Sequence, residues 1–361
     1  PCGAVFFVGY LFDGIRTNSG RGKHFSSVKT PQLLLLHFVT YSVLNLFTFL
    51  SSYDKIITYM FVNTFKLLSF LAFKLLIMKG SFCMPITEIL ERNAREFGND
   101  VALVEVNPEI RETRRVTWKE YELIEPNPVC HYRREITWSV FNEKANRFAN
   151  LLLSRGVKKG DKVGILLMNC LEWLPIYFGI LKTGALAVPL NFRYTPEEIK
   201  YCLDLAEVDI LVFGPEFIGR VEEIADEISK NRLLFYVGEN CPSFAEHYDR
   251  LTANCASTTP YIELTDEDDA AIYFSSCTTG FPKAILHNHE SLMHAARVEQ
   301  NHHGQTKDDV FLCIPPLYHT GAKMHWFGSL ISGGKAVLLK GVKPEFILDT
   351  VSREKCTIVW L

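Results

Sequence analysis

The chain has 361 residues, of which 48% are apolar and 22% are charged, values typical of a globular protein with a sizeable core. This length allows two domains or one large one. The net charge of −3, without any arginine-rich or lysine-rich run, excludes a general nucleic-acid binder. The ten cysteines are scattered and form no CxxC pair, so a reduced cytosolic compartment explains them better than a disulfide framework or a zinc site.

A change of composition near Met84 divides the chain. Residues 1–83 carry eight basic and two acidic residues, a net charge of +6, whereas the remainder carries 30 basic and 39 acidic residues, a net charge of −9. One interpretation is that this apolar, basic leader is not native, or is upstream translation, with Met78 or Met84 as the natural start. Residues 84–361 then form the folded part, and the protein is cytoplasmic.

The alternative interpretation is a membrane anchor through residues 32–78. The stretch 32–52 carries no charge and is long enough to cross a bilayer. The second apolar run, 56–78, is interrupted by Lys66 and Lys74, which are costly at the centre of a membrane. The protein contacts a membrane only if residues 1–83 are genuine.

From Met84 onward, the hydrophobic pattern alternates between short strands and amphipathic helices. Residues 139–155 form a strong amphipathic pattern. Thr195, followed by Pro196 in the first turn and by Glu198 three residues on, predicts a capping box at the start of a later helix. Helices are expected at 86–97, 139–155, 171–184, 195–207 and about 216–230, and strands at 101–106, 114–118, 134–138, 162–168, 185–191, 209–213 and 233–237.

This alternation predicts an α/β fold with doubly wound, mostly parallel sheets. Ligands of such sheets bind in loops at the carboxyl ends of strands. A strand is expected at 269–274, an extended run at 284–288, and a helix after it. The polar loop Ser275–Lys283 between the two extended runs therefore lies where a ligand is expected.

The composition of that loop indicates which ligand it binds. Hydroxyl side chains and backbone N–H groups can surround phosphate oxygens, Lys283 supplies a positive charge, and Pro282 restricts the turn beside it. No GxxxxGK[ST] motif is present, so this is not a Walker loop. The residues alone leave two possibilities open: a polyphosphate loop or an ordinary polar connection.

Three motifs occur in the order of a known family. SSCTTGFPKA (275–284) resembles the phosphate-loop signature [ST]SGTTGxPK[GA] of the acyl-adenylate-forming (AMP-binding) superfamily. LEWLPIYFGILKTGALAVPLN (171–191) resembles its LKxGAxxVPLN segment, and PPLYHTGAKMHWFGSLISGGKAVLL (315–339) its PLxHxxG segment. The similarity covers about 84–361 and is strongest to bacterial acyl-CoA synthetases.

The resemblance implies an acid–thiol ligase that works in two steps. ATP activates a carboxylic acid as an acyl-adenylate, and a thiol, usually coenzyme A, then displaces AMP while Mg²⁺ bridges the phosphate oxygens. It also implies an acyl pocket that includes His319. The residues that it assigns to the loop over the β- and γ-phosphates are Ser275, Ser276, Thr278, Thr279, Gly280 and Lys283.

Other histidines invite a metal hypothesis that the sequence does not favour. His302 and His303 are adjacent and project differently from a helix, and no carboxylate completes a triad with them. We therefore expect no metal site built from His287, His289, His294, His302 and His303.

Cys277 departs from the family pattern, which has a glycine at this loop position. If the position requires a positive φ, a β-carbon costs about 1–2 kcal/mol and crowds the phosphate. We expect Cys277 to lower ATP affinity without destroying the fold.

The chain stops at Leu361, before the adenine-binding segment, the ribose-binding acidic residue and the small C-terminal domain that the resemblance implies. The fold is thus expected to be an incomplete large N-terminal domain, with the catalytic residues downstream and little or no ligase activity in this fragment. Two further readings remain open: a noncatalytic protein that binds ATP or an acyl group, and an adenylation domain that loads a carrier protein.

Overall fold

The computed structural model describes residues 84–110, 113–118, 121–126, 132–275 and 282–360. The chain divides into two compact units, Pro1–Ser81 and Phe82–Leu361, and every described residue belongs to the second. The apolar stretches within 32–78 lie outside the described residues. Over the described part of the chain, no helix is both long and apolar enough to cross a membrane.

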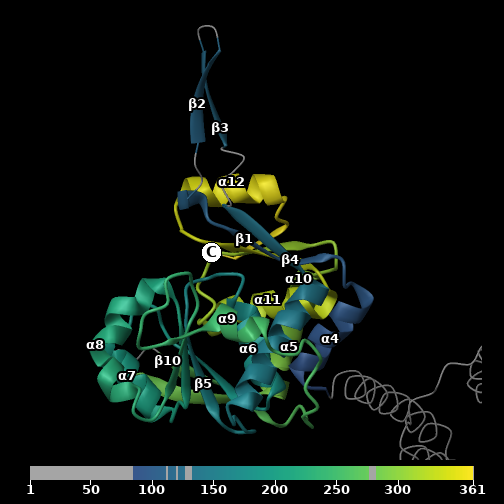
Figure 1. Ribbon diagram of the computed structural model, residues 1–361. Helices are drawn as coiled ribbons and strands as arrows, with labels where there is room; N and C mark the ends of the chain where they lie inside the picture. Colours follow the sequence, from purple (N-terminus) through teal and green to yellow (C-terminus); the bar gives the residue numbers. More distant parts are fainter. Residues whose placement is uncertain (1–83, 111–112, 119–120, 127–131, 276–281, 361) are drawn as a thin grey trace, which may run out of the picture. The chain divides into compact units, whose positions relative to one another are not determined.

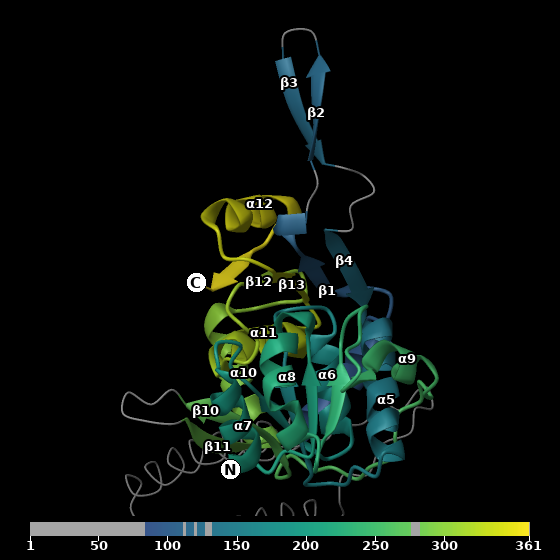
Figure 2. The same ribbon diagram turned by 60° about the vertical axis from the view of Figure 1, so that its left-hand side comes forward.

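The larger of the two main sheets is parallel except for one edge strand. Six of its strands run parallel to one another, and the edge strand β11 runs antiparallel to its neighbour β10 (Figure 2). In spatial order the seven strands are β11 (Lys283–Asn288), β10 (Asp269–Ser275), β6 (Leu186–Pro189), β5 (Lys162–Leu166), β7 (Ile210–Phe213), β8 (Leu233–Tyr236) and β9 (Glu246–His247).

The second main sheet follows the same rule, since only its edge strand β4 is antiparallel. Its spatial order is β14 (Ile358–Trp360), β12 (Val310–Cys313), β13 (Lys335–Leu339), β1 (Val101–Val106) and β4 (Arg133–Thr137). A separate hairpin pairs β2 (Thr113–Trp118) with β3 (Tyr121–Pro126).

Helices cover both faces of the seven-stranded sheet (Figure 1). One face carries α7 (Pro196–Leu205) and α8 (Ile218–Ile228). Between the two main sheets lie α4 (Ile86–Glu96), α5 (Trp138–Ser154), α6 (Trp173–Lys182), α10 (His289–His303) and α11 (Thr320–Ser332). The short helix α9 (Tyr248–Ala253) packs on α5, and α12 (Pro344–Glu354) covers the outer face of the five-stranded sheet. The predicted doubly wound, mostly parallel α/β arrangement is confirmed.

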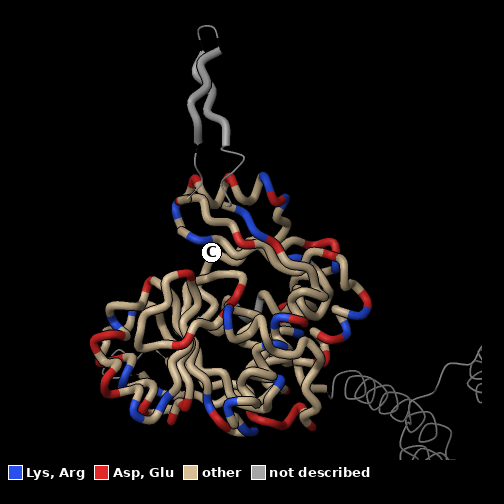
Figure 3. Tube along the Cα trace, viewed as in Figure 1, with Lys and Arg blue, Asp and Glu red and all other residues tan. Residues whose placement is uncertain are grey.

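The alternation of side chains along the strands explains these layers. On β13, Ala336 and Leu338 join the central core, whereas Val337 and Leu339 pack in the core beneath α12. Both faces of the strand are buried, which is why it reads as a continuous apolar run. Charged residues instead concentrate on the outer helices and loops (Figure 3).

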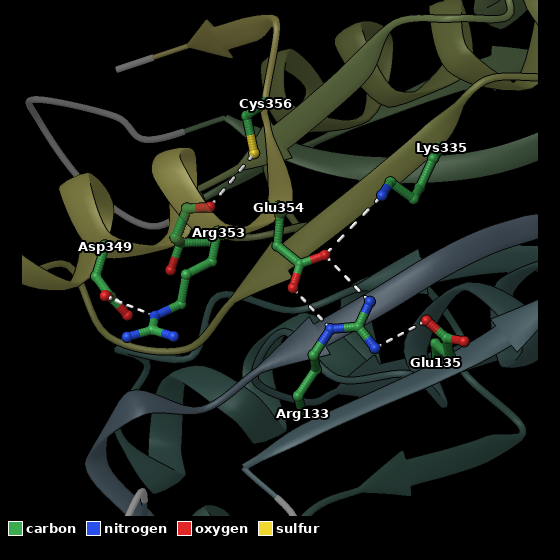
Figure 4. Close-up of polar contacts among 8 residues, drawn as sticks. Arg133, Glu135, Lys335, Asp349, Arg353, Glu354 and Cys356 are labelled. Atoms are coloured by element: carbon green, nitrogen blue, oxygen red, sulfur yellow. Dashed lines mark hydrogen bonds and ion pairs between the residues drawn. The ribbon is translucent and has the colours of Figure 1, made fainter. Parts of the chain in front are cut away.

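An ion-pair cluster fastens α12 to the five-stranded sheet (Figure 4). Glu354 at the end of α12 accepts a hydrogen bond of 2.6 Å from Nε of Arg133 on β4. Nζ of Lys335 on β13 lies 3.9 Å from the other carboxylate oxygen of Glu354. The Glu354 side chain is only 9% exposed, so its charge depends on these partners. Strands from distant parts of the chain are thus held to one helix.

Candidate functional site

The two ends of the predicted phosphate loop lie side by side. Ser275 is the last residue of β10 and Lys283 the first of β11, and the two pair directly in the antiparallel register. Oγ of Ser275 also donates a long hydrogen bond of 3.5 Å to the carbonyl oxygen of Lys283. The other expected phosphate contacts lie outside the described residues: Ser276, Thr278, Thr279 and Gly280.

A cavity of about 540 Å³ opens beside this pair. Because β6 and β10 are parallel neighbours, the segments that follow them meet at one edge of the sheet. We call this space the β10 cavity, and its volume is in the range of small-molecule sites. Its lining residues are Pro189, Asn191, Tyr194, Glu198, Tyr273, Phe274, Ser275, Pro282, Ile285, His287, Tyr318, His319 and Thr320.

Two predicted site residues that are far apart in sequence line this same cavity. Ser275 ends β10 of the seven-stranded sheet, and His319 lies between β12 of the five-stranded sheet and α11, yet both contribute to the cavity wall. His319 is exposed and immediately precedes α11, and its ring lies 5.6 Å from that of Tyr318. Lys283 is also exposed and pairs with Ser275, and among the described residues no carboxylate forms an ion pair with its ammonium group.

The start of α11 favours an anion in the β10 cavity. Thr320, its first residue, lines the cavity, and within the described part of the chain the preceding His319 makes no side-chain capping hydrogen bond. The first N–H groups of a 13-residue helix are therefore left for other acceptors, and the helix dipole adds to their attraction for negative charge. This arrangement suits a phosphate or a carboxylate.

The sequence interpretation missed the aromatic wall of the cavity. Tyr273 lies two residues before Ser275 on β10, and its hydroxyl is 3.0 Å from that of Tyr177. Burial raises the pKa of Tyr318 and lowers the pKa of His287, which favours the neutral form of both side chains. The period of two along β10 is a signal that could have placed Tyr273 beside Ser275.

The histidines considered as metal ligands lie in different surroundings, apart from His302 and His303, whose ring centroids are 5.2 Å apart. His287 faces the β10 cavity, whereas His289 is buried at the start of α10. Nε2 of His303 lies 3.2 Å from a carboxylate oxygen of Glu299. In the part of the chain that the structure describes, no three His, Cys, Asp or Glu residues are grouped to hold a metal ion.

The described residues thus form a mostly parallel α/β protein in which Ser275 and Lys283, the two ends of the predicted phosphate loop, pair at one edge of the larger sheet. The model of the AMP-binding enzyme family matches residues 90–361, and the chain belongs to this family. A crotonobetaine/carnitine–CoA ligase of Salmonella paratyphi C is 32% identical over 222 residues, which are 60% of this chain and 43% of the ligase. The ligase of Salmonella typhi is 31% identical over the same length. The chain thus spans less than half of the curated relatives it matches.

Solved structures show the same fold. An anthranilate–CoA ligase in complex with anthranoyl-AMP superimposes with a TM-score of 0.67 at 26% identity, covering 77% of this chain and 50% of that one. The N-terminal domain of FACL13 from Mycobacterium tuberculosis, solved with an inhibitor, gives a TM-score of 0.63 at 22% identity over 76% of this chain and 62% of that domain.

Proposed function

We propose that the protein joins a carboxylic acid to coenzyme A at the expense of ATP. A carboxylate oxygen attacks the α-phosphorus of ATP, the bond to the β-phosphate breaks, and pyrophosphate leaves with the electron pair. The thiol of coenzyme A then attacks the acyl carbon of the adenylate, loses its proton and releases AMP. The observation that supports this proposal is the pairing of Ser275 with Lys283, which brings the two ends of the predicted phosphate loop together beside the β10 cavity.

The loop residues have the task of binding the phosphates. Pyrophosphate gains negative charge as it leaves, so fixed donors aimed at it lower the barrier. In this proposal the hydroxyl groups of Ser275, Ser276, Thr278 and Thr279, the backbone at Gly280 and the ammonium group of Lys283 supply those donors. The exposed Lys283, with no carboxylate paired to it in the described part, supports the assignment.

Magnesium enters this proposal as part of MgATP. Glu198 is the only carboxylate among the described residues that line the β10 cavity, and it accepts a hydrogen bond of 2.9 Å from the backbone N–H of Thr195. The described protein groups therefore form no complete Mg²⁺ site of their own. In this proposal the ion is held mainly through the phosphate oxygens of ATP and through water.

We assign the acyl group to the wall formed by His319 and Tyr318. The partly apolar surface of this wall suits a carbon chain or ring, while the start of α11 suits the carboxylate. Six described cysteines are free, which supports a reducing compartment such as the cytoplasm.

Acid-dependent exchange of labelled pyrophosphate into ATP tests the first step, because exchange requires reversible adenylation. In the complete natural protein, at least one carboxylic acid of a chemically varied panel should support exchange. Lys283→Ala should lower the exchange rate on the order of 100-fold. Lys230→Ala, which removes an exposed lysine at the end of α8, is the matched control and should change nothing. Lack of exchange with every acid would contradict the proposal.

A further inference from the structure

A buried asparagine connects the loop after β5 to the segment that carries His319. Asn169 is only 7% exposed, and its side chain makes two hydrogen bonds to a segment almost 150 residues away. Its Nδ2 donates to the carbonyl oxygen of Pro315 at 3.0 Å, and its Oδ1 accepts from the backbone N–H of Leu317 at 2.9 Å. One partner is a donor and the other an acceptor, so the orientation of the amide is determined.

The segment held in this way is a tight turn. The backbone N–H of His319 donates to the carbonyl oxygen of Pro316 at 3.0 Å, which closes the turn Pro316–His319. Leu317, inside the turn, is fully buried in the central core. Asn169 therefore holds the turn on one side, and Leu317 anchors it from within. His319 at its end is left exposed to the β10 cavity.

The loop that carries Asn169 is fixed in its turn by the five-stranded sheet. Oε2 of Glu105 on β1 accepts from the backbone N–H of Leu171 at 2.9 Å and from Arg134 on β4 at 2.7 Å. Glu105 is only 5% exposed, so the surrounding residues and these two hydrogen bonds fix the position of its carboxylate. Two sets of hydrogen bonds, joined by the backbone between Asn169 and Leu171, thus connect the five-stranded sheet to the His319 turn.

We propose that Asn169 is a positioning residue that sets the acyl-site wall by clamping the Pro316–His319 turn. The predicted effect on substrate kinetics rests on the proposed function, whereas the hydrogen bonds of the clamp do not depend on it. A residue with both an amide donor and an amide acceptor is needed, since the turn offers a carbonyl oxygen and an N–H in fixed places. Asp at position 169 would keep the acceptor, lose the donor and face the Pro315 oxygen with a negative charge.

The kinetic test uses Asn169→Asp in the complete natural protein. The KM for the carboxylic acid should rise on the order of tenfold, while the affinity for ATP stays within twofold of wild type. In the His319→Ala background the same substitution should have a much smaller effect on that KM, because the clamp acts through His319. A purely structural role would change both substrates alike and would give additive effects.

A second readout does not depend on activity. Hydrogen exchange followed by mass spectrometry should show faster exchange in the peptide that contains Leu317 when Asn169 is replaced by Ala. The matched control is Asn150→Ala, which removes hydrogen bonds to the carbonyl oxygens of Ala256 and Thr258, away from the β10 cavity. It should leave the Leu317 peptide unchanged.

The two readouts separate this inference from the proposed function. Absence of adenylation in the wild-type protein, together with faster exchange at Leu317 in Asn169→Ala, would overturn the function and support the clamp. Unchanged exchange at Leu317, or an equal rise of the KM for both substrates, would overturn the clamp whatever the activity.

Discussion

Ser275 and Lys283 pair directly across the antiparallel edge of the seven-stranded sheet, although eight positions separate them in the sequence. This register places a hydroxyl group and a lysine at adjacent strand ends, beside a cavity that His319 also lines. This pairing is possible because β11 runs antiparallel to β10, so that the start of β11 lies beside the end of β10.

Replacing Cys277 by glycine should strengthen nucleotide binding. If position 277 requires a positive φ, its β-carbon costs about 1–2 kcal/mol, and glycine removes that cost. We expect the affinity for MgATP, measured by titration calorimetry on the complete natural protein, to rise about tenfold. Cys241→Ser, a change at a partly buried thiol away from the loop, is the control. Equal affinities of wild type and Cys277→Gly would show that position 277 does not need glycine.

His289 should make the fold sensitive to mild acid. Its Nδ1 accepts from the backbone N–H of Ile86 at 3.4 Å, and burial lowers its pKa to about 4. Its Nε2 is buried and has no hydrogen-bond partner among the residues that the structure describes. The folded state thus binds the proton less readily than the unfolded state, whose pKa is about 6.5. The unfolding free energy that depends on a neutral His289 is fully present above pH 6.5. It decreases as the pH falls from 6.5 toward 4, by up to about 1.4 kcal/mol per pH unit.

Urea unfolding at pH 7.5 and pH 5.5 checks this pH dependence. His289→Asn keeps an acceptor near Ile86 but cannot titrate, so it should remove about 1 kcal/mol of the difference between the two pH values. His294→Asn, at an exposed position of the same helix, should retain the full difference. If both variants behave like wild type, His289 does not carry the acid sensitivity.

The ion pair between α4 and α6 should be sensitive to the loss of its acid. Nζ of Lys182, whose side chain is 2% exposed, lies 2.6 Å from Oε1 of Glu91. Burial lowers the pKa of Lys182, and the charge of Glu91 opposes that shift. Glu91→Gln leaves a buried ammonium group without a counter-charge and should cost about 3 kcal/mol of unfolding free energy.

Chemical denaturation of three variants separates charge from packing. Lys182→Met removes the buried charge and should cost much less than Glu91→Gln. Glu143→Gln breaks an exposed pair with Arg147 and should cost less than about 1 kcal/mol. A larger loss for Lys182→Met than for Glu91→Gln would mean that the pair stabilises the fold chiefly through the lysine.

Local signals in the sequence predicted most single elements. The expected capping box is present, with the Thr195 hydroxyl accepting from Glu198 N–H and the Glu198 carboxylate accepting from Thr195 N–H. The helix expected at 171–184 spans Trp173–Lys182, with Gly184 just beyond it at φ +75°. Trp138, expected at the end of a strand, instead begins α5, because the side chain of Thr137 caps that helix.

Contacts between distant segments could not be predicted in this way. The apolar pattern of β1 and of β13 shows that each strand is buried, but nothing local to either segment states that Leu103 pairs with Ala336. The Asn169 clamp is hidden for the same reason, since its partners lie almost 150 residues further on. Ser275 and His319 came to one site in the sequence analysis only through the family resemblance.

The affinity of the complete natural protein for MgATP, compared between wild type and Lys283→Ala, tests the central claim most directly. The account predicts that wild type binds MgATP and that Lys283→Ala weakens binding by about tenfold or more, because a charge-assisted contact to phosphate is lost. Lys230→Ala should bind as wild type does. Equal binding by wild type and Lys283→Ala, or no binding by wild type, would contradict the assignment of the loop to the phosphates of ATP.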